Sequence, residues 1–423
     1  MKSIRYLYLG SNVLDAFSGR TAGLITQFIV VNQLGFEGRQ LAVLNSLSIV
    51  LYLLAAVPIG RLVDSLPPLR VLIGSLAVKA LLLSALAALY VAGGLSFWTI
   101  LILQVMQSFV GMFIDNSQVI TAVKIQEATP GPKLVARLEA ADSAVGIAAP
   151  GVVSLLAAGE FYREGYLGAA ALGICAAMLI AGPVRLRLAG TPGFVASAET
   201  AQSEAAQPDS AQPEPAQSEG EVRAGSFLDG FRLIIADRQV LLPVLLIAAG
   251  NLGLAFSDTP QTLFLLRETA LDPSAYASLK MFGAGAGLVA SLITPRIIDR
   301  FSFFRLVVVA TLGQLVATLF FLAAVLLRSQ VYYLAAASSV VWTMAVVLIN
   351  VAAMDYLVSA LPKGKIGIGL ASMRIVCMGA VPVGAMLGGY IVDYVGYTFS
   401  AGLWTGMALA TFVLGISLGR RQT

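Results

Sequence analysis

The sequence of 423 residues contains no histidine, two cysteines and few charged residues. Without histidine, the chain lacks histidine general bases, imidazole metal ligands and Ser-His-Asp triads. Cys175 and Cys377 lie far apart, each in an apolar stretch, and so form neither a CxxC motif nor a disulfide framework. No constellation of nucleophile and base is evident. We therefore expect no enzymatic activity, no metal site and no cofactor.

Hydrophobic residues are abundant instead. They make up 58% of the chain, whereas charged residues make up 12%, about half the share of roughly 25% in soluble domains. A chain this apolar belongs in a bilayer, whose hydrocarbon core of about 30 Å matches apolar segments of about 20 residues. We interpret the start, "MKSIRYLYLG", as part of a retained helix rather than a signal peptide, because no clear cleavage site follows it. The sequence predicts twelve transmembrane helices, at residues 6–32, 39–63, 71–93, 97–123, 138–158, 166–184, 239–266, 275–298, 305–327, 331–358, 367–392 and 398–419.

Basic residues between these segments indicate their orientation, because cytoplasmic loops carry an excess of Lys and Arg. With the N-terminus in the cytoplasm, 19 such residues face the cytoplasm and 4 face outward, the latter being Arg39, Arg163, Arg267 and Arg328. We therefore expect a multi-pass protein of the cell (inner or plasma) membrane, with both termini cytoplasmic. The same asymmetry explains the net charge of +4 without a nucleic-acid partner.

Residues 190–225 separate the sixth and seventh segments. They are rich in Ala, Gln, Ser, Pro and Glu and show no apolar periodicity, a composition that cannot bury enough surface to fold. The sequence therefore predicts an N-terminal six-helix bundle at 1–188, a largely disordered cytoplasmic linker at 189–236 and a C-terminal six-helix bundle at 237–423. A plain tether is the expected role of the linker, and regulation or partner binding is the alternative.

The two halves of the chain resemble each other. "GRLVDSLPPLR" at 60–70 has a counterpart, "PRIIDRFSFFR", at 295–305. "LEAADSAVGIAAPGVVSLL" from Leu138 matches "LASMRIVCMGAVPVGAMLGG" from Leu370, which aligns Pro150 with Pro382. A direct repeat of six-helix halves implies a pseudo-twofold axis along the membrane normal, with the substrate site at the interface near the midplane. We therefore expect an all-α polytopic membrane protein of two pseudo-symmetric six-helix bundles.

These features together resemble the major facilitator superfamily over nearly the whole chain. The first repeated stretch is similar to the family's loop signature, G-x-x-x-D-R-x-G-R-R: it keeps Gly60, Asp64 and Arg70 but has Ser65 where arginine is usual. "GIAAPG" and "GAVPVGAMLGG" resemble the Gly/Pro signature of family exporters, G-x-x-x-G-P-x-x-G-G, and point to the macrolide-efflux branch of the drug:proton antiporters. The resemblance implies helix bending or close packing at Gly146, Pro150, Gly151, Pro382, Gly384 and Gly388.

Polar residues recur at helical spacing in the first, fourth, seventh and tenth segments, which the resemblance implies line the central cavity. A charge kept in hydrocarbon costs about 2.5–3.5 kcal/mol and is a functional candidate. We expect Asp15, Asp115 or Asp258 to couple protons to substrate, with Arg20 as a charge partner. The alternative is that these stripes form hydrogen bonds between helices within each half. The further candidates for the substrate cavity are Asn12, Thr26, Gln104, Gln107, Gln118, Asn251, Thr343 and Asn350.

Complementary charges at the predicted cytoplasmic helix ends suggest two conformational latches. Family architecture implies that Asp64 meets Arg374 when the cytoplasmic side closes. It likewise implies that Asp142 meets Arg296 or Arg300. The alternative is an ion pair within one half. The latch candidates are therefore Asp64, Arg70, Asp142, Arg296, Asp299, Arg300 and Arg374.

The sequence as a whole predicts a secondary active transporter. It contains no P-loop, so an ion gradient is the expected energy source, with protons or sodium as coupling ion. The resemblance implies a proton-coupled antiporter for the efflux of amphipathic small molecules by alternating access, such as drugs in multidrug resistance, siderophores or other secreted metabolites. A proton-coupled importer of a nutrient or metabolite is one alternative, and a membrane receptor or scaffold without transport is another. We expect a monomer among membrane lipids, and we assign Lys79 and Lys280 to snorkelling or local pairing.

Overall fold

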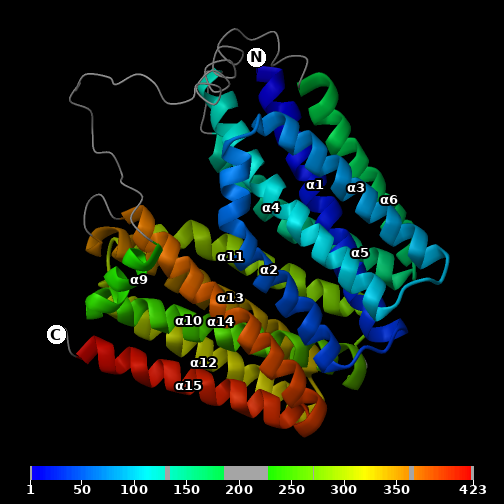
Figure 1. Ribbon diagram of the computed structural model, residues 1–423. Coiled ribbons are helices and arrows are strands. Elements are labelled where there is room, and N and C mark those ends of the chain that lie inside the picture. Colours follow the sequence, from blue (N-terminus) through cyan, green and yellow to red (C-terminus); the bar gives the residue numbers. More distant parts are fainter. Residues whose placement is uncertain (1, 129–133, 185–226, 270, 362–365, 421–423) are drawn as a thin grey trace, which may run out of the picture. The chain divides into compact units, whose positions relative to one another are not determined.

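The computed structural model describes residues 2–128, 134–184, 227–269, 271–361 and 366–420. Within these ranges all regular structure is helical and no strand occurs, which confirms the all-α prediction (Figure 1). The α-helices are α1 (Lys2–Phe28), α2 (Gly38–Asp64), α3 (Pro68–Val91), α4 (Phe97–Ala128), α5 (Leu134–Ala158), α6 (Tyr162–Leu179), α9 (Phe227–Ala236), α10 (Arg238–Leu263), α11 (Pro273–Ile298), α12 (Phe303–Leu327), α13 (Val331–Ala360), α14 (Ile366–Val395) and α15 (Tyr397–Arg420).

The helical form follows from the apolar composition, since backbone polar groups inside a bilayer have to be paired within the segment. Eleven helices in the described ranges are long and apolar enough to cross a membrane. The first predicted segment corresponds to α1, which is as long but carries Arg5, Asp15 and Arg20 and is not among the eleven. The twelve predicted segments therefore correspond to α1 and to these eleven helices.

Three of the predicted segments end in a π-helical turn. These turns are η1 (Ile29–Gln33) after α1, η2 (Ile180–Val184) after α6 and η3 (Phe264–Glu268) after α10. Arg267 in η3 donates hydrogen bonds from Nε and Nη2 to the carbonyl oxygen of Val31 in η1, at 3.0 and 2.7 Å. One guanidinium therefore joins the ends of the first and seventh predicted segments.

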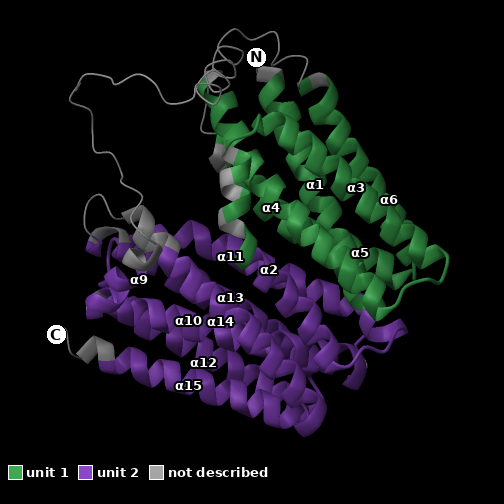
Figure 2. Ribbon diagram, viewed as in Figure 1, with its two compact units in different colours: residues 1–29, 54–217 green, residues 30–53, 218–423 purple. Residues whose placement is uncertain are grey.

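The described residues fall into two compact units (Figure 2). The first unit comprises the described residues within 1–29 and 54–217, and the second comprises those within 30–53 and 218–423. The boundary between them passes through α2, whose first part groups with the second unit. The sequence repeat did not indicate this, because it assigns all of α2 to the first bundle.

In the first unit, α1 packs against α5 and α6, and α3 packs against α4 and α6. Small polar side chains contribute to this packing: Ser18 Oγ in α1 donates a hydrogen bond to the carbonyl oxygen of Ala169 in α6, at 2.6 Å. Such bonds between helices are typical of membrane bundles. The buried core of this unit includes Ile4, Tyr8, Leu72, Leu76, Ile114 and Ile125.

In the second unit, α10 and α14 cross very closely. A Cβ atom at Gly384 would meet the backbone carbonyl group of Leu252, and one at Gly388 would meet that of Phe256. Small residues at such crossings let two helix backbones approach each other, so the crossing depends on glycine. Elsewhere in this unit α11 and α12 pack on α13, and α15 packs on α12.

The helix α9 lies inside the segment predicted as a linker. The apolar residues of its sequence, "FLDGFRLIIA", recur at helical spacing. Ile234 is buried in a cluster that also contains Val244 and Leu357, so α9 is part of the folded second unit. The rest of the predicted linker, residues 189–226, lies outside the described residues.

Candidate substrate cavity and charged residues

A cavity of about 280 Å³ lies within the second unit. Its residues from α10, α11 and α13 recur three or four positions apart along each helix, so each helix presents one face to the cavity. The lining residues are Leu254, Ser257, Asp258 and Gln261 from α10, Lys280, Gly283 and Ala284 from α11, Ser338, Ser339, Trp342 and Thr343 from α13, and Trp404 from α15. The cavity therefore combines charged, hydroxyl and aromatic side chains.

Two opposite charges line this cavity. Lys280 Nζ lies 3.8 Å from Asp258 Oδ1, and the two side chains are 41% and 43% exposed. Asn45 of α2 donates a hydrogen bond from Nδ2 to Asp258 Oδ2, at 3.4 Å. The Lys280 ammonium also lies 5.3 Å from the ring centre of Tyr276, where the ring face attracts a cation. Both charges are held by neighbours, yet both stay accessible to a small solute.

Two tryptophans form another part of the wall. The ring centres of Trp342 and Trp404 lie 5.0 Å apart with an angle of 50° between the rings. The two residues are 8% and 3% exposed. Their indole N–H groups are buried and have no hydrogen-bond partner in the part of the chain that the structure describes. An indole N–H is a donor only, and leaving one unpaired costs about 1–3 kcal/mol, so each favours an acceptor.

In the first unit, Asp15 forms an ion pair with Lys79 of α3. Lys79 Nζ lies 2.7 Å from Asp15 Oδ1, and the Lys79 and Asp15 side chains are only 18% and 9% exposed. A Cβ atom at Gly19, one helical turn after Asp15, would lie 3.3 Å from the ammonium nitrogen. The small residue therefore leaves room for the charge. Of the two roles expected for Lys79, the structure supports local pairing.

Arg20 pairs with Asp142 of α5 rather than with Asp15. The distance from Arg20 Nη2 to Asp142 Oδ2 is 2.5 Å, and both side chains are about half exposed. This pair lies within the first unit, as in the alternative to a latch. The two predicted latches would each join a residue of the first unit to one of the second, and they stay predictions. Arg296 donates a hydrogen bond to the carbonyl oxygen of Leu292 in its own helix, at 2.9 Å.

The other latch candidates lie at helix ends. Asp299 follows the last residue of α11 as its C-cap. Arg70, near the start of α3, is exposed, as are Arg300 and Arg374. Asp64 is the last residue of α2.

Several predicted cavity residues make hydrogen bonds to helix backbones. Asn12 Nδ2 donates to the carbonyl oxygen of Tyr8 at 2.7 Å, and Thr26 Oγ1 donates to that of Ala22 at 2.7 Å. Asn251 Nδ2 donates to the carbonyl oxygen of Cys377 in α14 at 3.2 Å. The bonds of Asn12 and Thr26 lie within α1, whereas the bond of Asn251 joins α10 to α14, as in the alternative in which polar stripes join helices within a half.

The remaining predicted residues divide by exposure. Gln104, Gln107 and Gln118 of α4 are half-buried, and Asp115 and Asn350 are exposed. Among all the predicted coupling and substrate-cavity residues, Asp258 and Thr343 are the two that line the cavity of the second unit.

Sequence reasoning missed the partner of Asp258 and the aromatic wall. A signal for Lys280 was present, because a single charge in an apolar segment needs a partner, and Asp258 and Lys280 lie in consecutive segments. No comparable signal distinguishes Trp342 and Trp404 from tryptophans at helix ends. Their proximity depends on which helices are neighbours, and spacing along the chain does not give that.

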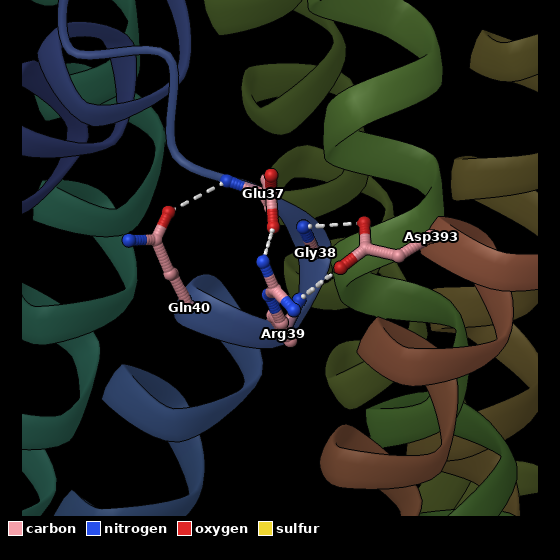
Figure 3. A network of polar contacts seen from close by, with 5 residues as sticks. All are labelled: Glu37, Gly38, Arg39, Gln40 and Asp393. Atoms are coloured by element: carbon pink, nitrogen blue, oxygen red, sulfur yellow. Dashed lines mark hydrogen bonds and ion pairs between the residues drawn. The ribbon is translucent and has the colours of Figure 1, made fainter.

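A polar network holds the start of α2 against the end of α14 within the second unit (Figure 3). Asp393 accepts hydrogen bonds from the backbone N–H of Gly38 through Oδ1, at 2.7 Å, and from that of Arg39 through Oδ2, at 2.8 Å. Arg39 also forms an ion pair with Glu37 at 2.6 Å. The first N–H groups of a helix lack intrahelical partners and favour a negative charge. Asp393 therefore caps α2 from another helix.

Comparison with known proteins agrees with this architecture. The model of the family described as Major Facilitator Superfamily matches residues 8–381 of the chain. No curated protein matches the sequence. A variant of the nucleoside transporter NupG superimposes with a TM-score of 0.72 and 13% identity, covering 98% of this chain and 99% of that one.

Two further solved structures share the fold. A bacterial homologue of the iron transporter ferroportin, in an inward-facing state, has a TM-score of 0.68 and 13% identity over 99% of both chains. A bacterial homologue of the human lysosomal transporter Spinster, inward-facing and unoccupied, has a TM-score of 0.65 and 16% identity over 99% of this chain and 98% of that one. Since the family match spans most of the sequence, the chain belongs to the Major Facilitator Superfamily.

Proposed function

We propose that the protein is a proton-coupled exporter of amphipathic small molecules that works by alternating access. The observation that carries this proposal is the cavity of the second unit, with Asp258 and Lys280 in its wall. Tryptophan rings and charged groups in one cavity suit a solute with an apolar and a polar part. The similarity of the Gly/Pro segments to the macrolide-efflux branch favours export of a drug, a siderophore or another secreted metabolite.

Asp258 is the best placed of the three carboxylates to couple protons to substrate. A coupling group has to exchange its proton according to whether substrate is bound, so it has to be accessible from the cavity. Asp258 lines the cavity and is 43% exposed, whereas the side chain of Asp15 is 9% exposed and paired with Lys79. Protonation of Asp258 would cancel its attraction to Lys280 and release the ammonium to other partners. Substrate and proton would then compete for the same carboxylate.

The latches remain part of the proposal as contacts that bias the transporter between its two states. Asp64 with Arg374 is the simpler latch. Asp142 is paired with Arg20 in the first unit, so a contact with Arg296 or Arg300 would require exchange of that partner. Each latch can shift the equilibrium only by the difference in its strength between the two states.

Transport in everted membrane vesicles tests the proposal. Vesicles with an acidic interior should accumulate substrates from a panel of cationic and zwitterionic drugs and metabolites, and an uncoupler should abolish the accumulation. Asp258→Asn should lose substrate-driven proton release because the coupling carboxylate is gone. Glu164→Gln, which makes the same chemical change at an exposed residue of α6, should retain it.

Three results would count against parts of this proposal. Full substrate-driven proton release in Asp258→Asn would remove Asp258 from the coupling role. Accumulation in right-side-out vesicles alone would favour the importer, and no gradient-dependent flux with any compound would favour a receptor or scaffold.

A further inference from the structure

We infer that the cavity of the second unit selects compact zwitterions of the amino-acid type, with an ammonium group, a carboxylate and an apolar side chain. This inference deepens the proposed function by naming the substrate class of the same site. It rests on the charge pair, the two indole donors and the size of the cavity.

The charge pair supplies the first reason. Asp258 and Lys280 lie 3.8 Å apart, whereas charge-assisted hydrogen bonds between nitrogen and oxygen are about 2.7–2.9 Å long. The two groups therefore attract each other without forming a close hydrogen-bonded ion pair. More than 40% of each side chain is exposed. A solute ammonium can bind Asp258 while a solute carboxylate binds Lys280. A simple cation would meet repulsion from Lys280, and a simple anion would meet repulsion from Asp258.

The position of Lys280 is fixed by close helix packing. A Cβ atom at Gly283, one turn after Lys280, would lie 2.6 Å from Ser339 Oγ and 3.5 Å from Thr343 Oγ1. At this point α11 therefore lies directly against the hydroxyl-bearing face of α13. The ammonium group of Lys280 also lies over the Tyr276 ring, which keeps it from extending away freely.

The indole groups supply the second reason. Trp342 and Trp404 line the cavity, are more than nine-tenths buried, and have N–H groups without partners in the described ranges. Because the indole nitrogens themselves are buried, a turn of the ring toward the cavity would bring each donor to a solute acceptor, and a carboxylate is a strong acceptor. The charged residues of the cavity wall belong to α10 and α11, whereas the tryptophans belong to α13 and α15, so one solute can contact both kinds of group. The ring surfaces are suited to the apolar side chain of the same solute.

The cavity volume limits the size of the solute. At about 280 Å³ it lies at the lower end of the range of roughly 300–1,000 Å³ for small-molecule pockets. A compact amphipathic zwitterion therefore fits the space better than a large macrocycle does.

Three probes of matched shape test this inference on the full-length protein in detergent at neutral pH. Phenylalanine carries both charges, phenethylamine carries only the ammonium group, and 3-phenylpropionate carries only the carboxylate. Binding of radiolabelled phenylalanine, with the other two as competitors, gives the three affinities. We expect the wild-type protein to prefer phenylalanine over both competitors by about tenfold or more, which corresponds to about 1.4 kcal/mol.

Removing either charge should change which of the three probes binds most tightly. Lys280→Met should favour phenethylamine over phenylalanine, because the repulsion of a cation is removed. Asp258→Asn should favour 3-phenylpropionate for the opposite reason. Trp342→Phe keeps a ring but removes one N–H donor and should weaken binding of phenylalanine and 3-phenylpropionate more than that of phenethylamine. Trp98→Phe, at a residue of α4 that is 68% exposed, is the matched control.

The outcomes separate this inference from the proposed function. Equal affinity of the wild-type protein for phenethylamine and phenylalanine, or charge variants with unchanged preference, would overturn the zwitterion inference. Zwitterion binding without proton-driven flux would leave the inference in place and contradict the exporter. Thermal unfolding of each variant shows whether it is folded, and the Trp342→Phe comparison tests the site if a charge variant fails to fold.

Discussion

Lys79 holds its ammonium group 2.7 Å from a carboxylate oxygen of Asp15 in the interior of the first unit. Lys79→Met would leave a buried carboxylate without this partner, and breaking a buried pair costs about 3–5 kcal/mol. We expect a lower temperature of thermal unfolding, measured by tryptophan fluorescence in detergent. Arg163→Met, at an exposed position of α6, is the control and should have little effect.

The double variant Asp15→Leu/Lys79→Met makes this prediction specific. It removes both charges, so it should recover much of the stability that Lys79→Met alone loses. A Lys79→Met protein as stable as the wild type would contradict the buried pair.

At the scale of residues, the sequence predicts which side chains matter better than it predicts their partners. Asp15 and Asp258 stand out because a charge in an apolar segment is costly. Their partners are Lys79 and Lys280, two residues whose sequence context offers no more than snorkelling or local pairing. Arg20 lies close to Asp15 in sequence but points to α5, where it pairs with Asp142. Direction around a helix, and not distance along the chain, decides these pairs.

At the scale of helices, the crossing of α10 and α14 depends on residues without a side chain. Gly388→Ala would place a Cβ atom against the backbone of Phe256, and overpacking of this kind typically costs about 1–3 kcal/mol. Gly379→Ala, in the same helix, has no atom within 4 Å of the added Cβ. We expect thermal unfolding at a lower temperature for Gly388→Ala, and little change or a small gain for Gly379→Ala, since alanine favours a helix. Equal effects at both positions would contradict the close crossing.

The helices themselves could be predicted from the sequence because apolarity is a property of each segment alone. The Gly/Pro pattern around Pro382 likewise indicated close packing, although it did not identify α10 as the neighbour. The cap on α2 could not be predicted. It joins Gly38 to Asp393, 355 residues further along the chain, and neither residue belongs to a motif that indicates the other.

At the scale of the whole molecule, the predicted tether provides a test that is independent of the cavity. Replacing residues 195–218 with a Gly/Ser sequence of the same length should leave transport in everted vesicles unchanged, because a tether needs reach and not a particular sequence. The same replacement over 227–236 should lower stability, because Ile234 of α9 is buried in the second unit. Loss of transport after the first replacement, with normal expression, would favour the regulatory or partner-binding alternative.

The overall architecture was largely predictable, and the candidate site only in part. Long apolar segments, the excess of basic residues in alternate loops and the internal repeat suffice for an all-helical transporter. Asp258 and Thr343, which were expected in a central cavity between the halves, line a cavity within the second unit. Lys280, Trp342 and Trp404 complete that cavity because α13 and α15 pack on α10 and α11 packs on α13, an arrangement that a single sequence does not specify.

The division of α2 between the units has a consequence for a chain that is cut in two. A cut within residues 189–226 would leave residues 30–53 on the N-terminal fragment, although they group with the second unit. Asp393 and Arg267, on the C-terminal fragment, hydrogen-bond the backbone of Gly38 and Val31 on the other. Ser46 Oγ likewise donates to the carbonyl oxygen of Pro382, at 3.1 Å. Two separately synthesised fragments would therefore complement each other, with the N-terminal piece donating part of a helix to its counterpart.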